Sequence, residues 1–509
     1  MTNFKNTLRS LFRKEKVTGS ALTALLIGAI IALNVIVYAL TVGFGLYYTP
    51  TEELDLSITD ASDAKFASYE GEKVNVIFCR ASETFDDETG TQDHAFFFHK
   101  TAEEFSKRYP NLINIEYVNA LTKKDEDGNI HERFALYQKD SEGNAQPIYE
   151  NSVIFDSVAN DKYRVITNVA AAAFYANPNT DSSDYLAYIG EEIFSSMVSW
   201  VLSETTQKAY FTTYHGESAE IYLTSMLACA GYEIDVLDMR KNSIPDDADL
   251  LIISNPTKDF EKSVEGGPTS EIDRLKSYLD NGGNLYVSLD PYASRLNNLE
   301  SVLKEYGISF SESEVEGKTY KNIVRDSSNS ITADNFTLIA SFADSTYGGE
   351  VSDILSGFDS GEVRLRECAA LNVEGNAKPL LLSSSSASTY ANGERTDKSG
   401  SYCIAATAST GGTYSEKYGN VFVVSSIYLT ANDALVTKGC ANKDFIYSVL
   451  DCVFDANNAP YGCTPIHYND GSLENLTMGT ARIYTIIILS IPVALAVVGI
   501  VIVRRRKNR

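Results

Sequence analysis

Six residues that could bind a ligand stand at or just after the ends of segments that the sequence predicts to be β-strands. They are His215, Gly216, Glu217, Asn255, Asp290 and Ser426. In an open parallel sheet, ligands bind outside the carboxyl ends of the strands, and nearby helix N-termini offer free N–H groups to an anion or a sugar hydroxyl. We expect a ligand-binding cleft there, with His215 as its strongest candidate. The alternative is that Asn255 and Asp290 only cap helices and turns, as these residue types commonly do.

Catalysis on such a sheet would need a nucleophile on a strand-to-helix elbow, activated by a His with a carboxylate behind it. The sequence contains no G-x-C-x-G or G-x-S-x-G elbow and no G-x-x-x-x-G-K-[ST] phosphate loop. Cys229 stands late in a predicted helix, and His467 lies close to the end of the chain, far from any elbow. We therefore predict that the protein is not an enzyme and needs no cofactor.

The cysteines and histidines do not show the spacing of a metal site. All seven cysteines lie between residues 79 and 463, and no C-x-x-C pair occurs, so zinc ribbons and thioredoxin-type redox motifs lack support. His94 and His99 have poor spacing for two ligands on one helix face. We predict no metal site and mostly buried, apolar cysteines. An exported location would permit disulfides, but an odd count leaves at least one thiol over.

The elements that must position the six residues alternate regularly between strands and helices. The expected strands are 209–214, 233–237, 250–254 and 285–289, and the expected helices are 218–230, 271–280 and 294–306. Gly231, Gly282 and Gly307 stand where these helices should stop. Strands that alternate with helices at this spacing predict an α/β fold with a parallel, doubly wound sheet.

The flanking segments predict a second, smaller α/β domain and an insertion. A β-α-β start is expected at 73–80, 98–109 and 113–118, and an amphipathic helix with a buried Trp200 at 189–201. Residues 308–375 lose the alternating rhythm, which indicates an insertion. Later strands should rejoin the same sheet, followed by a last helix; these are 379–383, 401–408, 420–426 and 443–454. The predicted domains are 48–180 (N-terminal α/β), 181–456 (doubly wound) and a stalk at 457–481.

Two apolar segments free of charged residues predict helices that span a membrane. Leu22–Leu46 and Ile483–Val503 are each long enough to cross a bilayer core of roughly 20 helical residues. We place the membrane helices at 21–47 and 482–503, and the cytoplasmic tails at 1–20 and 504–509. A cleaved signal peptide is the alternative for the first helix, but its apolar region would be only about 7–15 residues long.

The charge distribution supports this topology. The chain carries −25 overall, with +4 before the first apolar segment and +5 after the second, so the part between them carries −34. Basic flanks stay on the cytoplasmic side, which predicts a two-pass protein of the cytoplasmic membrane with its large domain outside. The acidic balance argues against a nucleic-acid partner. Two charge-free helices are too few to line a polar transport path alone.

The order of several segments resembles a known family. These segments are KAYFTTYHGES (208–218), IPDDADLLIISNP (244–256), EIDRLKSYLDNGGNLYVSLDP (271–291), LESVLKEYGI (299–308), NVFVVSSIYLTAND (420–433) and NKDFIYSVLDCVF (442–454). Together with the two terminal spans, they resemble the GldG-like auxiliary component of gliding-motility-type ABC transporters. The resemblance implies a module like class I glutamine amidotransferases in fold, shared with intraflagellar-transport proteins. It also implies two separately encoded partners, an ATPase and a membrane permease.

One departure from the family pattern lies in the first of these segments. The family's usual Gly-His-Gly-Glu appears here as Tyr214-His215-Gly216-Glu217. Because Tyr lacks the φ freedom of Gly, we expect the first residue of this turn to adopt a different conformation.

These observations together predict a non-enzymatic auxiliary subunit of an ABC transport system. Its outer domain would bind a partner protein, a surface polymer or a small ligand. Two alternatives stay open: a membrane-anchored hydrolase of amidotransferase-like fold, and a stand-alone surface adhesin.

Overall fold

The computed structural model describes residues 56–467, which belong to one compact unit. The gaps in this range are 70, 86–93, 119–136, 140–142, 158, 177–184, 219, 265–267, 328–329, 331–335, 345–361, 398, 412–416, 432–433, 436–439, 457, 461 and 464. Both predicted membrane helices, both tails and the end of the predicted stalk lie outside the described residues. Within the described ranges, no helix is both long and apolar enough to cross a membrane.

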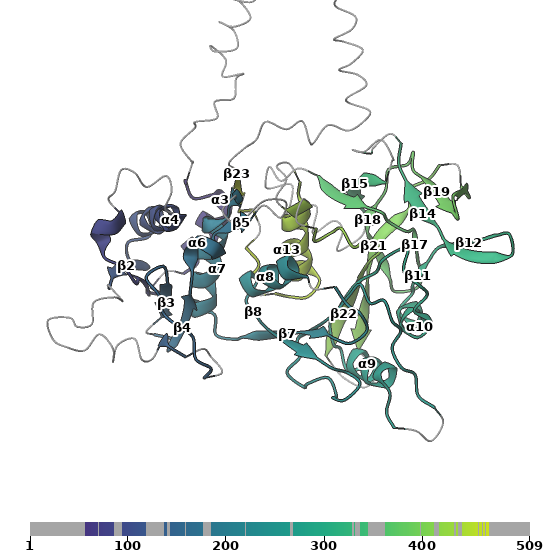
Figure 1. The fold of residues 1–509 in the computed structure, drawn as a ribbon, viewed down its shortest axis with the longest axis horizontal. Coiled ribbons are helices and arrows are strands. Elements are labelled where there is room, and N and C mark those ends of the chain that lie inside the picture. Colours follow the sequence, from purple (N-terminus) through teal and green to yellow (C-terminus); the bar gives the residue numbers. More distant parts are fainter. Residues whose placement is uncertain are drawn as a thin grey trace, which may run out of the picture. The chain divides into compact units, whose positions relative to one another are not determined.

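The first part of the fold is a four-stranded sheet in the order β2-β1-β3-β4 (Figure 1). Its elements are α3 (Asp60–Ala67), β1 (Val74–Phe78), η1 (Ser82–Phe85), α4 (His94–Arg108), β2 (Ile113–Tyr117), β3 (Val153–Ser157) and β4 (Lys162–Ile166). Strands β1 and β2 are parallel and joined through α4, which confirms the predicted β-α-β start. Strands β3 and β4 add in antiparallel fashion.

A small three-stranded sheet and one long helix connect this part to the rest. The elements are α6 (Val169–Ala172), β5 (Phe174–Ala176), β6 (Tyr185–Tyr188), α7 (Gly190–Leu202) and, from the end of the described chain, β23 (Ile466–His467). The small sheet has the order β23-β6-β5. Helix α7 carries Trp200, which is buried as predicted.

The second part is built on an 11-stranded sheet with the path β16-β15-β18-β21-β22-β10-β9-β7-β8. Its first elements are β7 (Gln207–Thr212), α8 (Ile221–Cys229), β8 (Tyr232–Leu237), β9 (Leu250–Ser254), α9 (Glu271–Asp280), β10 (Leu285–Ser288) and α10 (Asn297–Glu305). Later come β11 (Ile308–Phe310), β15 (Thr337–Phe342), β16 (Val363–Arg366), β17 (Leu371–Val373), β18 (Lys378–Leu382), β21 (Cys403–Gly411), β22 (Tyr418–Val424) and α13 (Asn442–Cys452). The predicted helix-stop glycines Gly231, Gly282 and Gly307 all have positive φ, as helix-ending glycines often do.

The prediction of a parallel, doubly wound sheet is correct for one part of the sheet and wrong for the other. Strands β22, β10, β9, β7 and β8 run parallel, but β21, β18, β15 and β16 add antiparallel. For the β21–β22 pair the physical reason is the length of the connection, because only residues 412–417 separate the two strands. Such a short connection cannot hold the crossover helix that a parallel pair requires.

The predicted insertion, 308–375, contributes strands to this sheet and builds two small sheets beside it. Strands β15 and β16 extend the antiparallel edge, and β11 and β17 pair off its main path. The small sheets pair β12 (Glu312–Val315) with β13 (Lys318–Lys321), and β14 (Ile323–Arg325) with β19 (Ser388–Ala391) and β20 (Glu394–Arg395).

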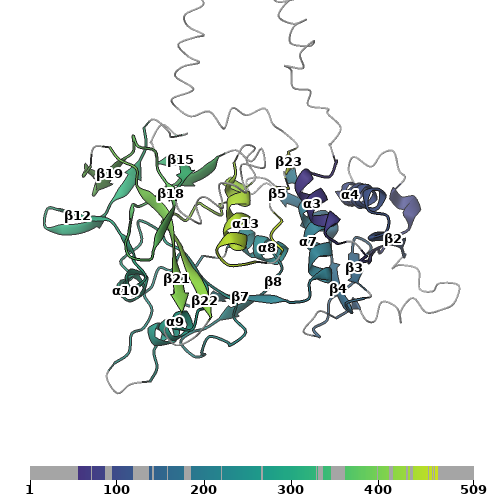
Figure 2. The same ribbon diagram turned by 180° about the vertical axis from the view of Figure 1, so that it is seen from behind.

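Helices cover both faces of the parallel half. Leu250 and Ile252 of β9 face a core that includes α8 and α13, while Leu251 and Ile253 face a core that includes α9 and α10 (Figures 1 and 2). This alternation follows from the two-residue period of a strand. A strand buried on both faces must be apolar throughout, as the sequence LLIIS of β9 nearly is.

One hydrophobic core runs from the first sheet into the second. The Phe194 ring of α7 stacks on Phe105 of α4 with centroids 4.5 Å apart, and Phe66 of α3 lies 4.6 Å from Phe105. The same cluster of buried side chains includes Leu227 of α8 and Phe445 of α13. The two sheets therefore share apolar packing through α7.

A buried ion pair joins α7 to α13 inside this core. The Lys443 ammonium lies 2.6 Å from a Glu192 carboxylate oxygen, and both side chains are 3% exposed. The Tyr447 hydroxyl donates to the other Glu192 oxygen at 2.5 Å, and Lys443 also donates to the Cys463 carbonyl at 2.5 Å. Burying each of these two charges would cost several kcal/mol if it had no partner. Here the charges have partners on three segments of the chain.

The two ends of the described chain lie side by side (Figure 2). In α3, the Ser62 hydroxyl is 3.5 Å from the Cys463 thiol, and Lys65 donates to the Asn458 carbonyl at 3.1 Å. Strand β23 pairs with β6 through Ile466 and His467. The first and last described segments of the chain therefore lie in the same region of the body.

Replacing one member of the buried ion pair should destabilise the protein strongly. We expect Lys443→Met to lower the free energy of unfolding by about 3–5 kcal/mol, because Glu192 keeps a buried charge without its main partner. The neutral pair Glu192→Gln with Lys443→Met should recover most of this loss. Urea unfolding of the full chain in detergent, followed by Trp200 fluorescence, measures both effects.

The matched control is Lys276→Met, which removes the same side chain from an exposed pair with Glu305. Its effect should stay below about 1 kcal/mol, as is typical of surface pairs. Equal effects of the two Lys→Met changes would contradict the assigned role of Lys443.

Candidate functional site

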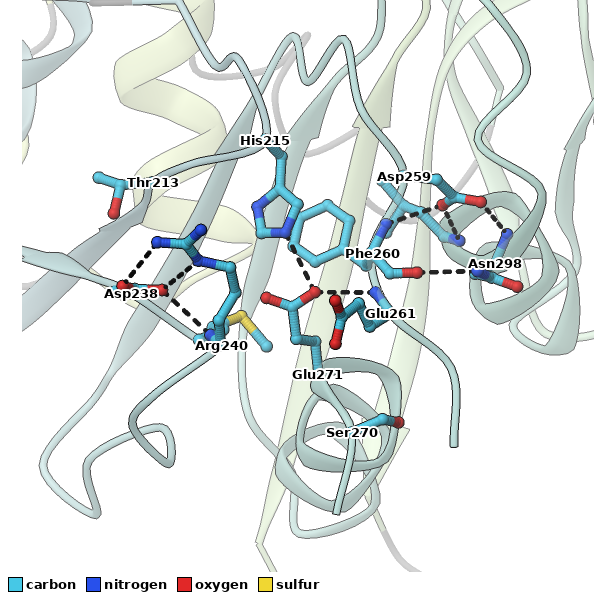
Figure 3. Close-up of polar contacts among 12 residues, drawn as sticks. Thr213, His215, Asp238, Arg240, Asp259, Phe260, Glu261, Ser270, Glu271 and Asn298 are labelled. Carbon is cyan, nitrogen blue, oxygen red and sulfur yellow. Dashed lines mark hydrogen bonds and ion pairs between the residues drawn. The ribbon is translucent and has the colours of Figure 1, made fainter. Parts of the chain in front are cut away.

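The predicted site residue His215 follows β7 and is held between the carboxylates of Glu217 and Glu271. Figure 3 shows the contact with Glu271. Its Nδ1 atom lies 3.1 Å from Glu217 Oε1, and its Nε2 atom lies 3.1 Å from Glu271 Oε2. The imidazole stacks on the Phe260 ring, with centroids 3.9 Å apart. The three polar side chains are between 2% and 8% exposed. The structure therefore contains a buried carboxylate–imidazole–carboxylate cluster at the end of a parallel strand.

Glu271 reaches this cluster because it opens helix α9. Ser270 caps the helix, and its hydroxyl and the Asp273 carboxylate form a reciprocal capping box. The position at the positive end of the helix favours a carboxylate. Glu271 Oε2 also accepts from the Glu261 backbone N–H at 2.8 Å, so the loop before the helix is tied to the same atom.

The electrostatics favour a charged imidazole. Burial lowers the pKa of His215, but hydrogen bonds and negative charge from Glu217 and Glu271 outweigh it, so its pKa is raised. Burial likewise acts to raise the pKa of Glu217, and the hydrogen bonds from His215 reverse this, so its pKa is lowered. Both ring nitrogens of an imidazolium are donors, which suits the two carboxylate acceptors.

The turn around His215 has an unusual backbone. Tyr214 takes φ of +80° although it is a bulky residue, so the expectation that Tyr would avoid the conformation open to Gly is wrong. The Arg240 guanidinium lies over the exposed Tyr214 ring at 3.9 Å, and this cation–π contact helps to hold the residue in place. Gly216 has φ of +76°, and a Cβ there would lie 2.1 Å from the Thr257 hydroxyl.

Asn255 belongs to a second polar cluster, centred on Glu220. Glu220 Oε1 accepts from the Asn255 amide at 3.0 Å and from the Ser254 hydroxyl at 2.9 Å, and Oε2 accepts from Thr430 at 2.7 Å. The Asn255 backbone N–H donates to the Ser288 carbonyl at 3.0 Å. Glu220 thus connects the ends of β9 and β22, and Asn255 serves as one of its donors.

Asp290 and Ser426 make contacts that do not involve His215. Asp290 Oδ1 accepts from the Tyr292 backbone N–H at 2.8 Å, which is the turn-capping role given above as the alternative. The Ser426 hydroxyl is buried and donates to the Arg366 carbonyl at 2.6 Å. Within the described ranges, no hydrogen bond joins either residue to His215. The six predicted residues therefore do not form one site.

The His215 and Glu220 clusters stabilise loops. They leave no ring nitrogen of His215 free for proton transfer to or from a substrate. A general base needs a free ring nitrogen within reach of a substrate, and both nitrogens of His215 already face carboxylates. Five cysteines, Cys79, Cys229, Cys368, Cys403 and Cys463, are buried free thiols. Burial raises the pKa of Cys229 and of Cys368 to about 12, which disfavours the reactive thiolate.

Three contributors to these clusters were not among the sequence candidates: Glu271, Phe260 and Glu220. Ser270 and Asp273 show that a helix begins near Glu271, but the carboxylate meets an imidazole 56 residues away. Glu220 and Thr430 are separated by 210 residues. No local pattern carries information over such distances.

No family model and no curated protein matches the chain. Among solved structures, the mmIFT52 N-terminal domain is 20% identical with a TM-score of 0.35, over 48% of this chain and 95% of that domain. PurLQS from Thermotoga maritima is 11% identical with a TM-score of 0.27, over 48% and 99%. A ThuA-like protein from Bacteroides uniformis is 11% identical with a TM-score of 0.32, over 51% and 94%. At these TM-scores the likenesses carry no argument about function.

The His215 cluster should make stability depend on pH. A raised pKa means that the contribution of His215 is complete below its unfolded value near 6.5 and is lost as pH rises through the folded value. We expect Glu271→Gln to cost about 2 kcal/mol near pH 6 and clearly less at pH 9. Unfolding curves at several pH values measure the difference. The control Glu305→Gln alters an exposed carboxylate, and a pH-independent effect of Glu271→Gln would contradict the assignment.

A side chain at Gly216 should disturb the turn by collision as well as by backbone strain. Gly216→Ala should lower the free energy of unfolding by about 1–3 kcal/mol more than Gly317→Ala. Gly317 has a similar φ of +75° but open space around its Cβ position. Adding Thr257→Ala to Gly216→Ala should remove most of the excess. Equal costs at the two glycines would show that the Thr257 contact is unimportant.

Proposed function

We propose that this protein is a non-enzymatic, membrane-anchored auxiliary subunit of an ABC transport system. Residues 21–47 and 482–503 would form its two membrane helices, with both termini cytoplasmic. The α/β body between them would lie outside and bind a partner protein, a surface polymer or a small ligand. The amidotransferase-like reading of the sheet, with β7 to β10 as its parallel centre, is part of the same proposal.

The observation that carries this proposal is the proximity of α3 and β23. Ser62 and Cys463, one near each end of the body, are 3.5 Å apart. The apolar segment Leu22–Leu46 connects to the first end and Ile483–Val503 to the second. A body whose two connections emerge together can be held by two helices that cross the same membrane. The basic tails place those helices in one orientation.

The state of the strand-end residues supports a role without catalysis. Glu217, Glu271 and Glu220 each accept hydrogen bonds from neighbouring loops or strands. The thiols of Cys229, Cys368 and Cys403 are buried, and burial raises their pKa values. We infer that a domain of this kind binds a ligand or a partner protein. A separate ATPase would supply the energy for transport.

Co-purification from mild detergent tests the proposal. Full-length protein with a C-terminal tag should retain an ATPase subunit and a polytopic permease. Protease added to intact spheroplasts should cleave the 56–467 body, because this topology places it outside. Reproducible absence of both subunits, or protection of the body in intact cells that disappears on lysis, would contradict the proposal.

The variant Lys443→Met with Glu192→Gln serves as a control for the co-purification. It changes the interior of the body but leaves the surface and both apolar segments intact. It should therefore retain the same partners as the natural chain. Replacing the segment 22–46 by an unrelated apolar helix tests whether the first helix itself carries the contact with the permease.

A further inference from the structure

A cavity of about 430 Å³ lies beside the end of β10 and has no role in the clusters described above. Three segments line it: the loop after Asp290, strands β13 and β14, and the β19–β20 hairpin. The aromatic and basic side chains of the lining are Tyr292, Arg295, Tyr320, Lys321, Arg325 and Tyr390. The volume falls in the roughly 300–1,000 Å³ range of small-molecule sites. The cavity also lies where an open α/β sheet binds its ligands.

Arg325 is the cation of this cavity that has no acidic partner in the described part of the chain. Its guanidinium lies over the Tyr390 ring at 4.6 Å and over the Phe336 ring at 4.3 Å. Its Nε atom is buried without a hydrogen-bond partner. The aromatic contacts fix the plane of the guanidinium, which has no ion pair among the described residues, and a planar fork of this kind suits a bidentate oxyanion.

The other two cations already have carboxylate partners. Arg295 pairs with Glu312, and the Lys321 ammonium lies 3.8 Å from a Glu300 oxygen. Lys321 also donates to the Ala293 carbonyl at 3.4 Å, and burial lowers its pKa. After these pairs are counted, Arg325 is the cation of the lining that has no ion pair among the described residues. The Asp290 carboxylate adds a negative charge near Lys321 and Tyr292, and its Oδ1 accepts from the Tyr292 backbone N–H at 2.8 Å.

Aromatic and polar groups complete the lining. Tyr292, Tyr320 and Tyr390 provide rings with polar edges, and Thr319 and Asn392 provide hydrogen-bonding groups. Asn392 and Gly393 both have positive φ, as in the two-residue hairpin turn that Asn-Gly favours, so this wall is well fixed. A ligand that matches such a lining has an apolar ring face, several hydroxyls and one negative group.

We propose that this cavity binds an acidic sugar unit, with the carboxylate on Arg325 and the sugar ring against the tyrosines. A body of net charge −34 between the tails repels a long polyanion, which favours a single unit or the end of a chain. The inference extends the proposed function by naming a ligand class for the outer domain. The ligand inference rests on the proposed transport function only for its biological meaning. The cavity itself is lined entirely by residues of this chain.

Calorimetric titration of the purified full chain in detergent tests the inference. The probes are D-galacturonate, neutral D-galactose, a galacturonate disaccharide and inorganic phosphate. Galacturonate should bind at least about tenfold more tightly than galactose, which lacks the charge. Tighter binding of the disaccharide would identify the end of a polymer as the source, and equal binding would identify the monosaccharide.

Variants separate the cavity from general charge effects. Arg325→Met should weaken galacturonate binding by about tenfold or more, and Arg325→Lys should recover only part of it, since Lys cannot form the bidentate pair. Tyr292→Ala, at a 55% exposed position, should weaken binding without affecting the fold. Arg108→Met removes an equal charge from an exposed pair with Asp63 and should have no effect.

Several outcomes would overturn the inference. These are equal binding of galacturonate and galactose, binding of phosphate as tight as that of galacturonate, no binding of galacturonate, or unchanged binding by Arg325→Met and Tyr292→Ala. Melting temperatures of the ligand-free variants show whether each one is folded. Because the titration needs no ATPase or permease, its failure and a failure of co-purification are separate results.

Discussion

The Lys443–Glu192 ion pair is the constraint on which the assembly of this body depends. It lies in the core that the two sheets share and links α7, α13 and the segment at Cys463. Apolar packing between helices is tolerant of small shifts, but a buried charge pair is not, because separating the ions leaves each one desolvated without a partner. We infer that the pair fixes how α7 meets α13. The Tyr447 hydroxyl adds a third, directional contact.

The same physical strategy recurs at the strand ends. His215 and Glu220 are each surrounded by groups from other loops, so polar residues at the carboxyl edge serve mainly to hold that edge together. A sheet edge organised in this way is a rigid frame and offers few unused groups to a ligand. The cavity with Arg325 differs, because its guanidinium is positioned by aromatic rings and has no ion pair among the described residues.

The helices and strands of the parallel half could be predicted from the sequence. The direction in which other strands pair with them, and the distant residues that they contact, could not. Helices α8, α9 and α10 could be predicted because apolar periodicity and the stop residues Gly231, Gly282 and Gly307 are local signals. The antiparallel direction of β18 and β21 could not be predicted in the same way. The direction of a strand depends on the path of the segments that connect it to its neighbours, which local apolar periodicity does not show. Tyr214 shows the limit of propensity, because tertiary contacts keep it at φ of +80°. Within the site, His215 was identifiable and Glu271 was not.

The pairing of β23 with β6 has a mechanical consequence. Among the described residues, the strand pairs with β6 through Ile466 and His467, so the described ladder is short. Tension applied to the chain beyond residue 467 would load this short ladder first, and only afterwards the contact between Lys443 and the Cys463 carbonyl. Because α3 lies beside the same segment, a pull on either connection acts near one point.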